Sequence, residues 1–162
     1  MGPFPISQLD AWRLREGLAR LEEQDPARAA RVRLRARQSA LRLAADFPGD
    51  AHSGVLDEGI DAEERFADFA DSEPCPALDP ASGLCDLYAA RPLTCRTFGQ
   101  PVRVGADVGV CELCFQGAGE EEIAACAAEI DVDALEAPLL RGFEAKGRTI
   151  VTFALAVETL GR

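Results

Sequence analysis

Residues 7–46 read SQLDAWRLREGLARLEEQDPARAARVRLRARQSALRLAAD, and alanine, leucine and arginine dominate this stretch. All three residues favour the helical conformation of the backbone. Ser7 is placed to cap a helix over residues 8–24, because its hydroxyl can accept a hydrogen bond from a free amide of the first turn. Asp25 and Pro26 then restart the chain as the cap and first residue of a second helix, a position that tolerates proline. The stretch therefore predicts two helices that form an antiparallel hairpin.

Beyond this hairpin the helical pattern weakens and turn-forming residues become frequent. Residues 48–60 are rich in Gly, Asp and Ser and hold His52, the only histidine of the chain, so we expect a loop here. A short helix capped by Asp61 is expected to follow and to reach Asp71.

Residues 72–119 carry five of the six cysteines and prolines at positions 74, 76, 80, 92 and 101. Their periodicity is weak, and we expect one short strand over residues 100–104 that returns through Gly105 to Gly109. A loop-rich segment of this length needs something besides secondary structure to keep it ordered. Bound metal is the candidate that the clustered cysteines indicate.

The last part of the chain returns to helix-forming sequence. Three consecutive glutamates from position 120 favour a helix N-terminus through their charge. A further helix is expected to begin at Asp133, with Pro138 bending it, and the apolar stretch 149–160 is expected to form the last helix.

These elements together predict a mainly α protein, a small helical domain with an irregular cysteine-rich metal-binding segment. We expect a single domain over residues 1–162. It is divided into a helical hairpin (1–47), a metal-binding segment (48–119) and C-terminal helices (120–162).

The chain is acidic, with 17 Lys and Arg residues against 28 Asp and Glu residues and a formal net charge of −11. Residues 1–47 hold nine arginines against six acids, a net of +3, whereas residues 48–162 have a net of −14. Such an acidic chain disfavours nucleic acid as a partner, because contacts to phosphate need a basic surface. We expect the arginines of the hairpin to pair with the acidic remainder of the chain.

The sequence also indicates where the protein works. No stretch approaches the roughly 18 consecutive apolar residues of a membrane-spanning helix, so we expect no membrane partner. The first residues lack a basic segment followed by an apolar one, and we therefore expect a cytoplasmic protein. The sequence carries no motif of the common hydrolases, nucleotide-binding proteins or zincins, which leaves open whether the chain is an enzyme.

The cysteines are the candidate metal ligands of the chain. Residues 75–96 read CPALDPASGLCDLYAARPLTCR, and the pair Cys111-Glu-Leu-Cys114 follows. The C-x2-C spacing lets one tight turn present two sulfurs to one ion, and thiolates hold zinc at about 2.3 Å in tetrahedral sites. Thiolates also hold iron–sulfur clusters, while ordinary buried thiols or disulfides are the remaining interpretation. The expected metal ligands are Cys75, Cys85, Cys95, Cys111 and Cys114.

Five thiols exceed the four ligands of a closed tetrahedral site. Cys111 and Cys114 are the first choice because of their spacing. Cys75 and Cys95 come next because they flank the proline-rich loops, with Cys85 nearly equivalent to them. The sequence leaves open which four of the five bind.

Five other residues of or near this segment have structural interpretations. Cys126 lies among alanines and is expected to be a small buried helical residue rather than a ligand. His52 has no paired spacing with any cysteine and is expected to be exposed. Asp86 is also expected to be exposed. Tyr88 is expected to pack on the metal loop, and Asp79, before a proline, is expected to start a turn.

The cysteine motif resembles a known family. The pattern Cys-Pro-x-Leu-Asp … Cys-x-Leu-Tyr-x-x-Arg-Pro-x-x-Cys-Arg over residues 75–96 is similar to the signature of the YkgJ-type (CxxCxxCC) family of zinc- or iron-chelating domains. This resemblance implies metal binding, with iron–sulfur chemistry in a branch similar to flagellin lysine methylases. The cysteine block that names the family is expected before Cys75. Residues 1–74 hold no cysteine, so any site built from that block is missing or replaced.

The resulting hypothesis is a metal-binding protein whose thiolate site holds structural zinc. One alternative is iron or an iron–sulfur cluster, used in electron transfer or protein modification. Another is a protein-interaction module whose surface is shaped by the metal, which adds a protein partner to the metal ion. A closed site of four thiolates has no open position for water, so we expect no hydrolysis from it.

Overall fold

The chain forms two compact units in the computed structural model: Met1–Pro92 with Gly142–Arg162, and Leu93–Arg141. The structure describes residues 2–104, 107–111, 114–129, 132–144 and 146–156. Helices predominate over strands in these residues, which confirms the mainly α class. None of the described helices combines the length and apolar character needed to cross a bilayer.

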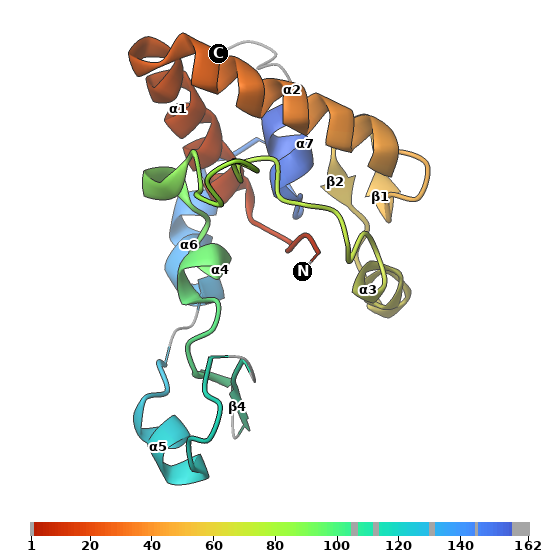
Figure 1. The fold of residues 1–162 in the computed structure, drawn as a ribbon. Coiled ribbons are helices and arrows are strands. Elements are labelled where there is room, and N and C mark those ends of the chain that lie inside the picture. Colours follow the sequence, from red (N-terminus) through yellow and green to blue (C-terminus); the bar gives the residue numbers. More distant parts are fainter. Residues whose placement is uncertain (1, 105–106, 112–113, 130–131, 145, 157–162) are drawn as a thin grey trace. The chain divides into compact units, whose positions relative to one another are not determined.

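The elements follow one another along the chain as coloured in Figure 1. They are α1 (Gln8–Gln24), α2 (Pro26–Leu43), β1 (Gly49–Asp50), β2 (Val55–Leu56), α3 (Ile60–Ala67), the 3-10 helix η1 (Tyr88–Ala90), α4 (Leu93–Thr97), β3 (Val102–Val104), β4 (Asp107–Gly109), α5 (Glu120–Ala125), α6 (Val132–Leu140) and α7 (Val151–Ala156).

Helices α1 and α2 begin where their capping residues predict. The Ser7 hydroxyl accepts a hydrogen bond from the Asp10 amide at 3.2 Å, and the Asp25 carboxylate accepts one from the Arg28 amide at 3.0 Å. These caps satisfy amides that have no partner within the helix. The prediction for α1 is confirmed at both ends, whereas α2 ends at Leu43, before the end of the predicted stretch.

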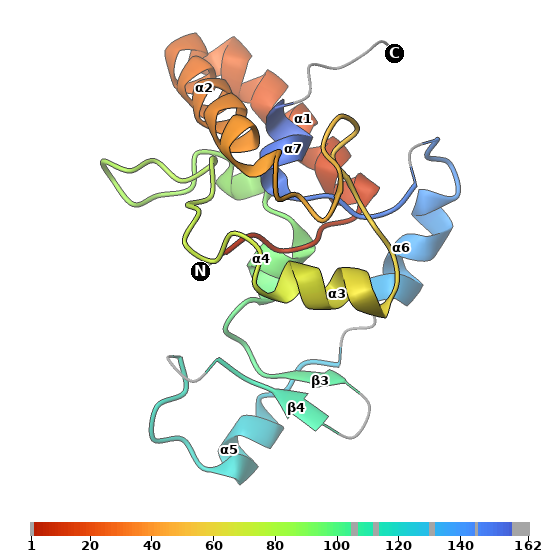
Figure 2. The same ribbon diagram turned by 90° about the vertical axis from the view of Figure 1, so that its right-hand side faces the viewer.

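The larger unit is built on the packing of α1, α2 and α7, which lie side by side in Figures 1 and 2. Their buried faces form one apolar cluster that includes Leu14, Val32 and Ala154. A second cluster lies beneath the β1–β2 hairpin and contains Phe47, Phe69 and Phe153, among other residues. Removing this apolar surface from water supplies the main driving force for folding of the unit.

Close approach at Gly17 brings η1 against α1. A Cβ atom on Gly17 would lie 2.4 Å from the Cβ of Ala90, so only glycine leaves room for η1 here. Because η1 begins at Tyr88, this contact fixes the chain shortly after Cys85 to the helical core.

The region between α2 and α3 differs from the sequence prediction. The loop expected over 48–60 contains the antiparallel hairpin of β1 and β2. Its strands are too short to produce a visible alternating pattern in the sequence. Helix α3 begins at Ile60, with Gly59 rather than Asp61 at the capping position.

The smaller unit contains α4, α5, α6 and a two-stranded sheet. Strand β3 confirms the strand predicted near residue 102 and pairs antiparallel with β4. The segment after α5 adds hydrogen bonds to it: the Arg103 amide donates to the Ala128 carbonyl at 3.0 Å, and the Ala128 amide donates to the Pro101 carbonyl at 2.9 Å.

The smaller unit also corrects the predicted helix boundaries. Helix α5 begins at Glu120 as expected and ends at Ala125. Helix α6 begins at Val132, so Asp133 lies within the helix, as does Pro138.

The two units differ in their apolar cores. Every member of both apolar clusters belongs to the larger unit. Among the described residues of Leu93–Arg141, none takes part in a buried apolar cluster. The described part of the smaller unit therefore shows no apolar cluster of the kind that usually stabilises a folded region.

Candidate metal centre

Cys75 and Cys85 lie on a hairpin-like turn of the larger unit. The Asp86 amide donates to the Ala77 carbonyl at 2.7 Å, and the Asp79 amide donates to the Leu84 carbonyl at 2.8 Å. Inside this turn Asp79 accepts hydrogen bonds from the Ala81 amide and the Ser82 hydroxyl, as its predicted role in a turn requires. The turn thus brings two cysteines that are ten residues apart into electrostatic contact.

Three arginines on one side of α2 bind the segment that carries these cysteines. Arg28, Arg35 and Arg42 are spaced seven residues apart, which places them along a single face of the helix. Arg28 and Arg35 bind Asp86, and Arg42 binds Glu73 at 2.6 Å. The prediction that the hairpin arginines pair with the acidic remainder of the chain is confirmed for these three.

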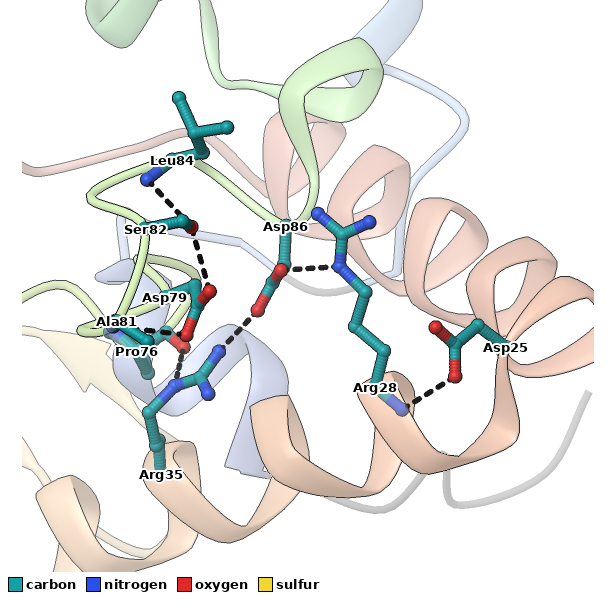
Figure 3. A network of polar contacts seen from close by, with 9 residues as sticks. All are labelled: Asp25, Arg28, Arg35, Pro76, Asp79, Ala81, Ser82, Leu84 and Asp86. Atoms are coloured by element: carbon teal, nitrogen blue, oxygen red, sulfur yellow. Dashed lines mark hydrogen bonds and ion pairs between the residues drawn. The ribbon is translucent and has the colours of Figure 1, made fainter.

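The expectation that Asp86 is exposed is wrong. Its side chain is 2% exposed, and each of its two carboxylate oxygens lies 2.5 Å from a guanidinium nitrogen (Figure 3). Two arginines seven residues apart on a helix, together with an aspartate directly after a cysteine, are the sequence signal that could have indicated this contact. A buried carboxylate can keep its charge here because both of its oxygens have charged partners.

Cys75 is exposed as a residue and Cys85 is half-buried, but the atoms packed around their sulfurs partly desolvate both thiols. Such packing raises the pKa of Cys75 and the pKa of Cys85, because the thiolate loses solvation. Backbone amides oppose these changes: Ala77 lowers the pKa of Cys75, and Leu87 lowers that of Cys85. Arg91 also lowers the pKa of Cys85 through its charge, so positive charge and amide donors surround the sulfurs.

Tyr88 follows this turn and is largely exposed, with 64% of its surface accessible. The guanidinium of Arg91 lies over the Tyr88 ring, 3.8 Å from its centroid, in a cation–π contact. The ring therefore orients an arginine whose charge acts on Cys85.

Cys111 and Cys114 form the second thiol pair, in the smaller unit. The Cys114 amide donates to the Cys111 carbonyl at 3.0 Å, which closes the tight turn that the C-x2-C spacing predicts. A hydrogen bond with Cys111 raises the pKa of the Cys114 thiol, so the two sulfurs are in contact.

Gly99 makes room for the second pair. A Cβ atom at this position would lie 2.9 Å from the Cys114 sulfur, and the backbone φ of +91° is itself one that favours glycine. A glycine after α4 thus holds the sulfur close to the backbone.

The remaining candidate residues lie apart from these two pairs in the chain. Cys95 is half-buried on α4. Cys126 is exposed at the C-terminal cap of α5, so the expectation that it is buried is wrong. The helix ends one residue before Cys126, which removes it from any buried helical face. His52 is exposed, as predicted.

The donor set suits a soft metal, since every described cysteine is a free thiol. Within either unit, the described His, Cys, Asp and Glu side chains form no group of three or more placed to hold an ion. Each unit contains one pair of interacting cysteines, Cys75 with Cys85 and Cys111 with Cys114.

Paired free thiols on a helical scaffold are donors of the kind that metal-binding proteins use. The sequence profile of the CxxCxxCC family, described as a zinc- or iron-chelating domain, matches residues 20–122. The chain belongs to this family, and the resemblance noted in residues 75–96 is confirmed. Searches of curated proteins and of solved structures returned no match.

Proposed function

We propose that the chain binds zinc through thiolates drawn from five cysteines, and that the ion has a structural role. The proposed ligands are Cys75, Cys85, Cys95, Cys111 and Cys114. Membership of the family supports metal binding, and the thiol pairs support sulfur as the donor atom.

The observation that carries the proposal is the contact between Cys111 and Cys114 across a closed turn. Two sulfurs held together by a turn can bind one ion with little further ordering of the backbone, which makes the pair an effective chelate. Cys75 and Cys85 offer a second pair held by backbone hydrogen bonds and arginines.

The structural role is supported by the lack of an apolar cluster among the described residues of the smaller unit. Metal binding by thiolates contributes directly to folding free energy where the chain alone has too little to bury. The described residues of Leu93–Arg141 have no apolar cluster, and they include Cys95, Cys111 and Cys114. Zinc is therefore proposed to order this part of the chain.

The test is metal analysis of matched cysteine variants, purified without oxygen. We expect Cys114→Ser to lose metal and to increase amide hydrogen exchange in residues 93–129. Cys126→Ser is the control, because Cys126 is also an exposed cysteine of the smaller unit. We expect it to keep the metal content of the wild type. Equal metal content in wild type and Cys114→Ser would remove Cys114 from the ligand set.

The identity of the ion follows from the same preparations. Colourless protein with stoichiometric zinc supports the proposal. A brown protein with visible absorbance and bound iron would replace zinc with an iron–sulfur cluster, since thiolates bind both. Wild-type protein that takes up neither metal would contradict the proposed function.

A further inference from the structure

Two arginines of α2 bind the residues that directly follow the cysteines of the first pair. Asp86 follows Cys85, and its carboxylate receives Arg28 Nε and Arg35 Nη2, each at 2.5 Å. Pro76 follows Cys75, and its carbonyl accepts a hydrogen bond from Arg35 Nε at 2.8 Å (Figure 3). One guanidinium, that of Arg35, therefore contacts both arms of the turn.

We propose that Arg28, Arg35 and Asp86, here called the arginine clamp, hold Cys75 and Cys85 in place for the metal before the ion arrives. These three residues are positioning residues, since they act on the thiols through the backbone that follows each cysteine. The inference rests on the proposed function, because it assigns these residues to the assembly of that same site.

The geometry of the clamp fixes the relative positions of the groups that it binds. The planar guanidinium of Arg35 donates from Nε to a carbonyl and from Nη2 to a carboxylate, which fixes the two acceptors relative to each other. Arg28 occupies the second carboxylate oxygen, so Asp86 cannot rotate without losing a charged partner.

Burial separates the clamp from an ordinary surface ion pair. The side chain of Asp86 is 2% exposed, whereas those of Arg28 and Arg35 are 38% and 21% exposed. The burial is therefore that of the carboxylate, which depends on the two arginines for its stabilisation. The pair between Arg33 and Glu22 joins the same helix α2 to α1, but its side chains are 32% and 52% exposed. This exposed pair links the two helices rather than a cysteine arm, and it provides a matched control.

The helical core provides the rigid base that positioning requires. Ala29, Val32 and Ala36 lie on α2 between or next to the clamp arginines and are fully buried. On the other side of Asp86, Leu87 is 4% exposed and belongs to the same apolar cluster. The clamp therefore ties the cysteine turn to a region that is ordered by apolar burial.

The experiment compares Asp86→Asn with Arg33→Gln in the full chain, first after treatment with a chelator. Asp86→Asn keeps the side-chain shape and removes the charge that both arginines bind. We expect the backbone amides of positions 79 and 86, which close the turn, to exchange at least tenfold faster than those of the wild type, whereas Arg33→Gln leaves them unchanged.

Zinc affinity, measured by competition with a chromogenic chelator, is the second readout. We expect Asp86→Asn to weaken binding by roughly 10–100-fold, the effect usual for groups that orient metal ligands. Arg33→Gln should bind zinc as the wild type does. A role confined to overall stability would change the unfolding midpoint of the variant and leave its zinc affinity intact.

Each possible result of these measurements either supports or overturns the inference. Wild-type exchange rates in metal-free Asp86→Asn, or wild-type zinc affinity, would overturn the clamp while leaving the proposed function in place. A wild-type protein that binds no zinc or iron overturns the proposed function and the inference together.

A conservative variant keeps the inference testable if Asp86→Asn fails to show a helical circular dichroism spectrum. Arg35→Lys retains the charge but cannot reproduce the planar fork that joins the Pro76 carbonyl to Asp86. We expect about tenfold weaker zinc binding from it, by the same loss of ligand orientation. Unchanged affinity in this variant would overturn the inference.

Discussion

The two thiol pairs are held by different means. Cys75 and Cys85 lie on a turn that is bound to a packed helix by two arginines and the buried Asp86, in a unit with two apolar clusters. Cys111 and Cys114 share a tight turn in a unit whose described residues contain no such cluster. The first pair lies on a turn bound by arginines of α2, whereas the second lies on a tight turn beside Gly99.

This difference separates a unit held by apolar burial from one whose described residues form no apolar cluster. Apolar burial stabilises the larger unit regardless of metal. The proposed function instead assigns the order of the smaller unit to metal coordination, as in small metal-binding domains. Variants of each unit can therefore separate the two sources of order.

The largest expected effect comes from breaking the apolar core of the larger unit. Leu14 is 1% exposed in the cluster shared by α1, α2 and α7. Leu14→Ala should reduce the free energy of unfolding by about 2–5 kcal/mol, from lost burial and the cavity left behind. Urea denaturation followed by helical circular dichroism measures this loss. Leu41→Ala, at an 81% exposed position of α2, is the control and should change little; equal losses in both variants would contradict the packing described.

A smaller loss of stability is expected from a substitution beside the second thiol pair. Gly99→Ala forces a side chain onto a φ of +91° and against the Cys114 sulfur. Gly117→Ala also has a positive φ, +78°, but its Cβ would meet nothing within 4 Å. Both variants should lose about 1–2 kcal/mol of stability from the backbone conformation.

The two glycine variants should differ in metal binding. Only Gly99→Ala displaces the Cys114 sulfur from Cys111, so we expect roughly tenfold weaker zinc affinity for it alone. Chelator competition on both variants measures the difference. If both bind zinc equally well, the position of the sulfur above Gly99 has no bearing on the metal.

The smallest effect concerns a polar contact inside the larger unit. The hydroxyls of Ser39 on α2 and Thr152 on α7 lie 3.2 Å apart in a buried position. Ser39→Ala should reduce the free energy of unfolding by about 1 kcal/mol, because the Thr152 hydroxyl loses its partner there. Adding Thr152→Val should recover much of this loss in thermal or urea denaturation. A double variant that loses the sum of both single effects would show that the hydroxyls are not coupled.

Local sequence signals predicted the elements whose ends depend on neighbouring residues. Ser7 and Asp25 are followed by helices because a cap acts within three residues of itself. The strand at β3 and the turn between Cys111 and Cys114 were predicted for the same reason, since both depend on short-range backbone preferences.

Other features depended on contacts between distant residues and were predicted wrongly or missed. Asp86 was expected to be exposed as a charged residue next to a cysteine, but its partners Arg28 and Arg35 lie more than fifty residues earlier. Cys126 was expected to be buried because alanines flank it, but α5 ends before it. The β1–β2 hairpin was missed because two-residue strands carry no periodic signal.

The amino-acid order alone was enough for the helical class, the two capped helices, the cysteine spacing and the family. Each of these follows from preferences that act over a few residues or from a contiguous motif. Folding in three dimensions was needed to pair Cys75 with Cys85, to bury Asp86 between two arginines, and to place both apolar clusters of the described residues in one unit. These properties arise from the packing of segments far apart in the chain, where solvent exclusion and charge partners depend on which surfaces meet.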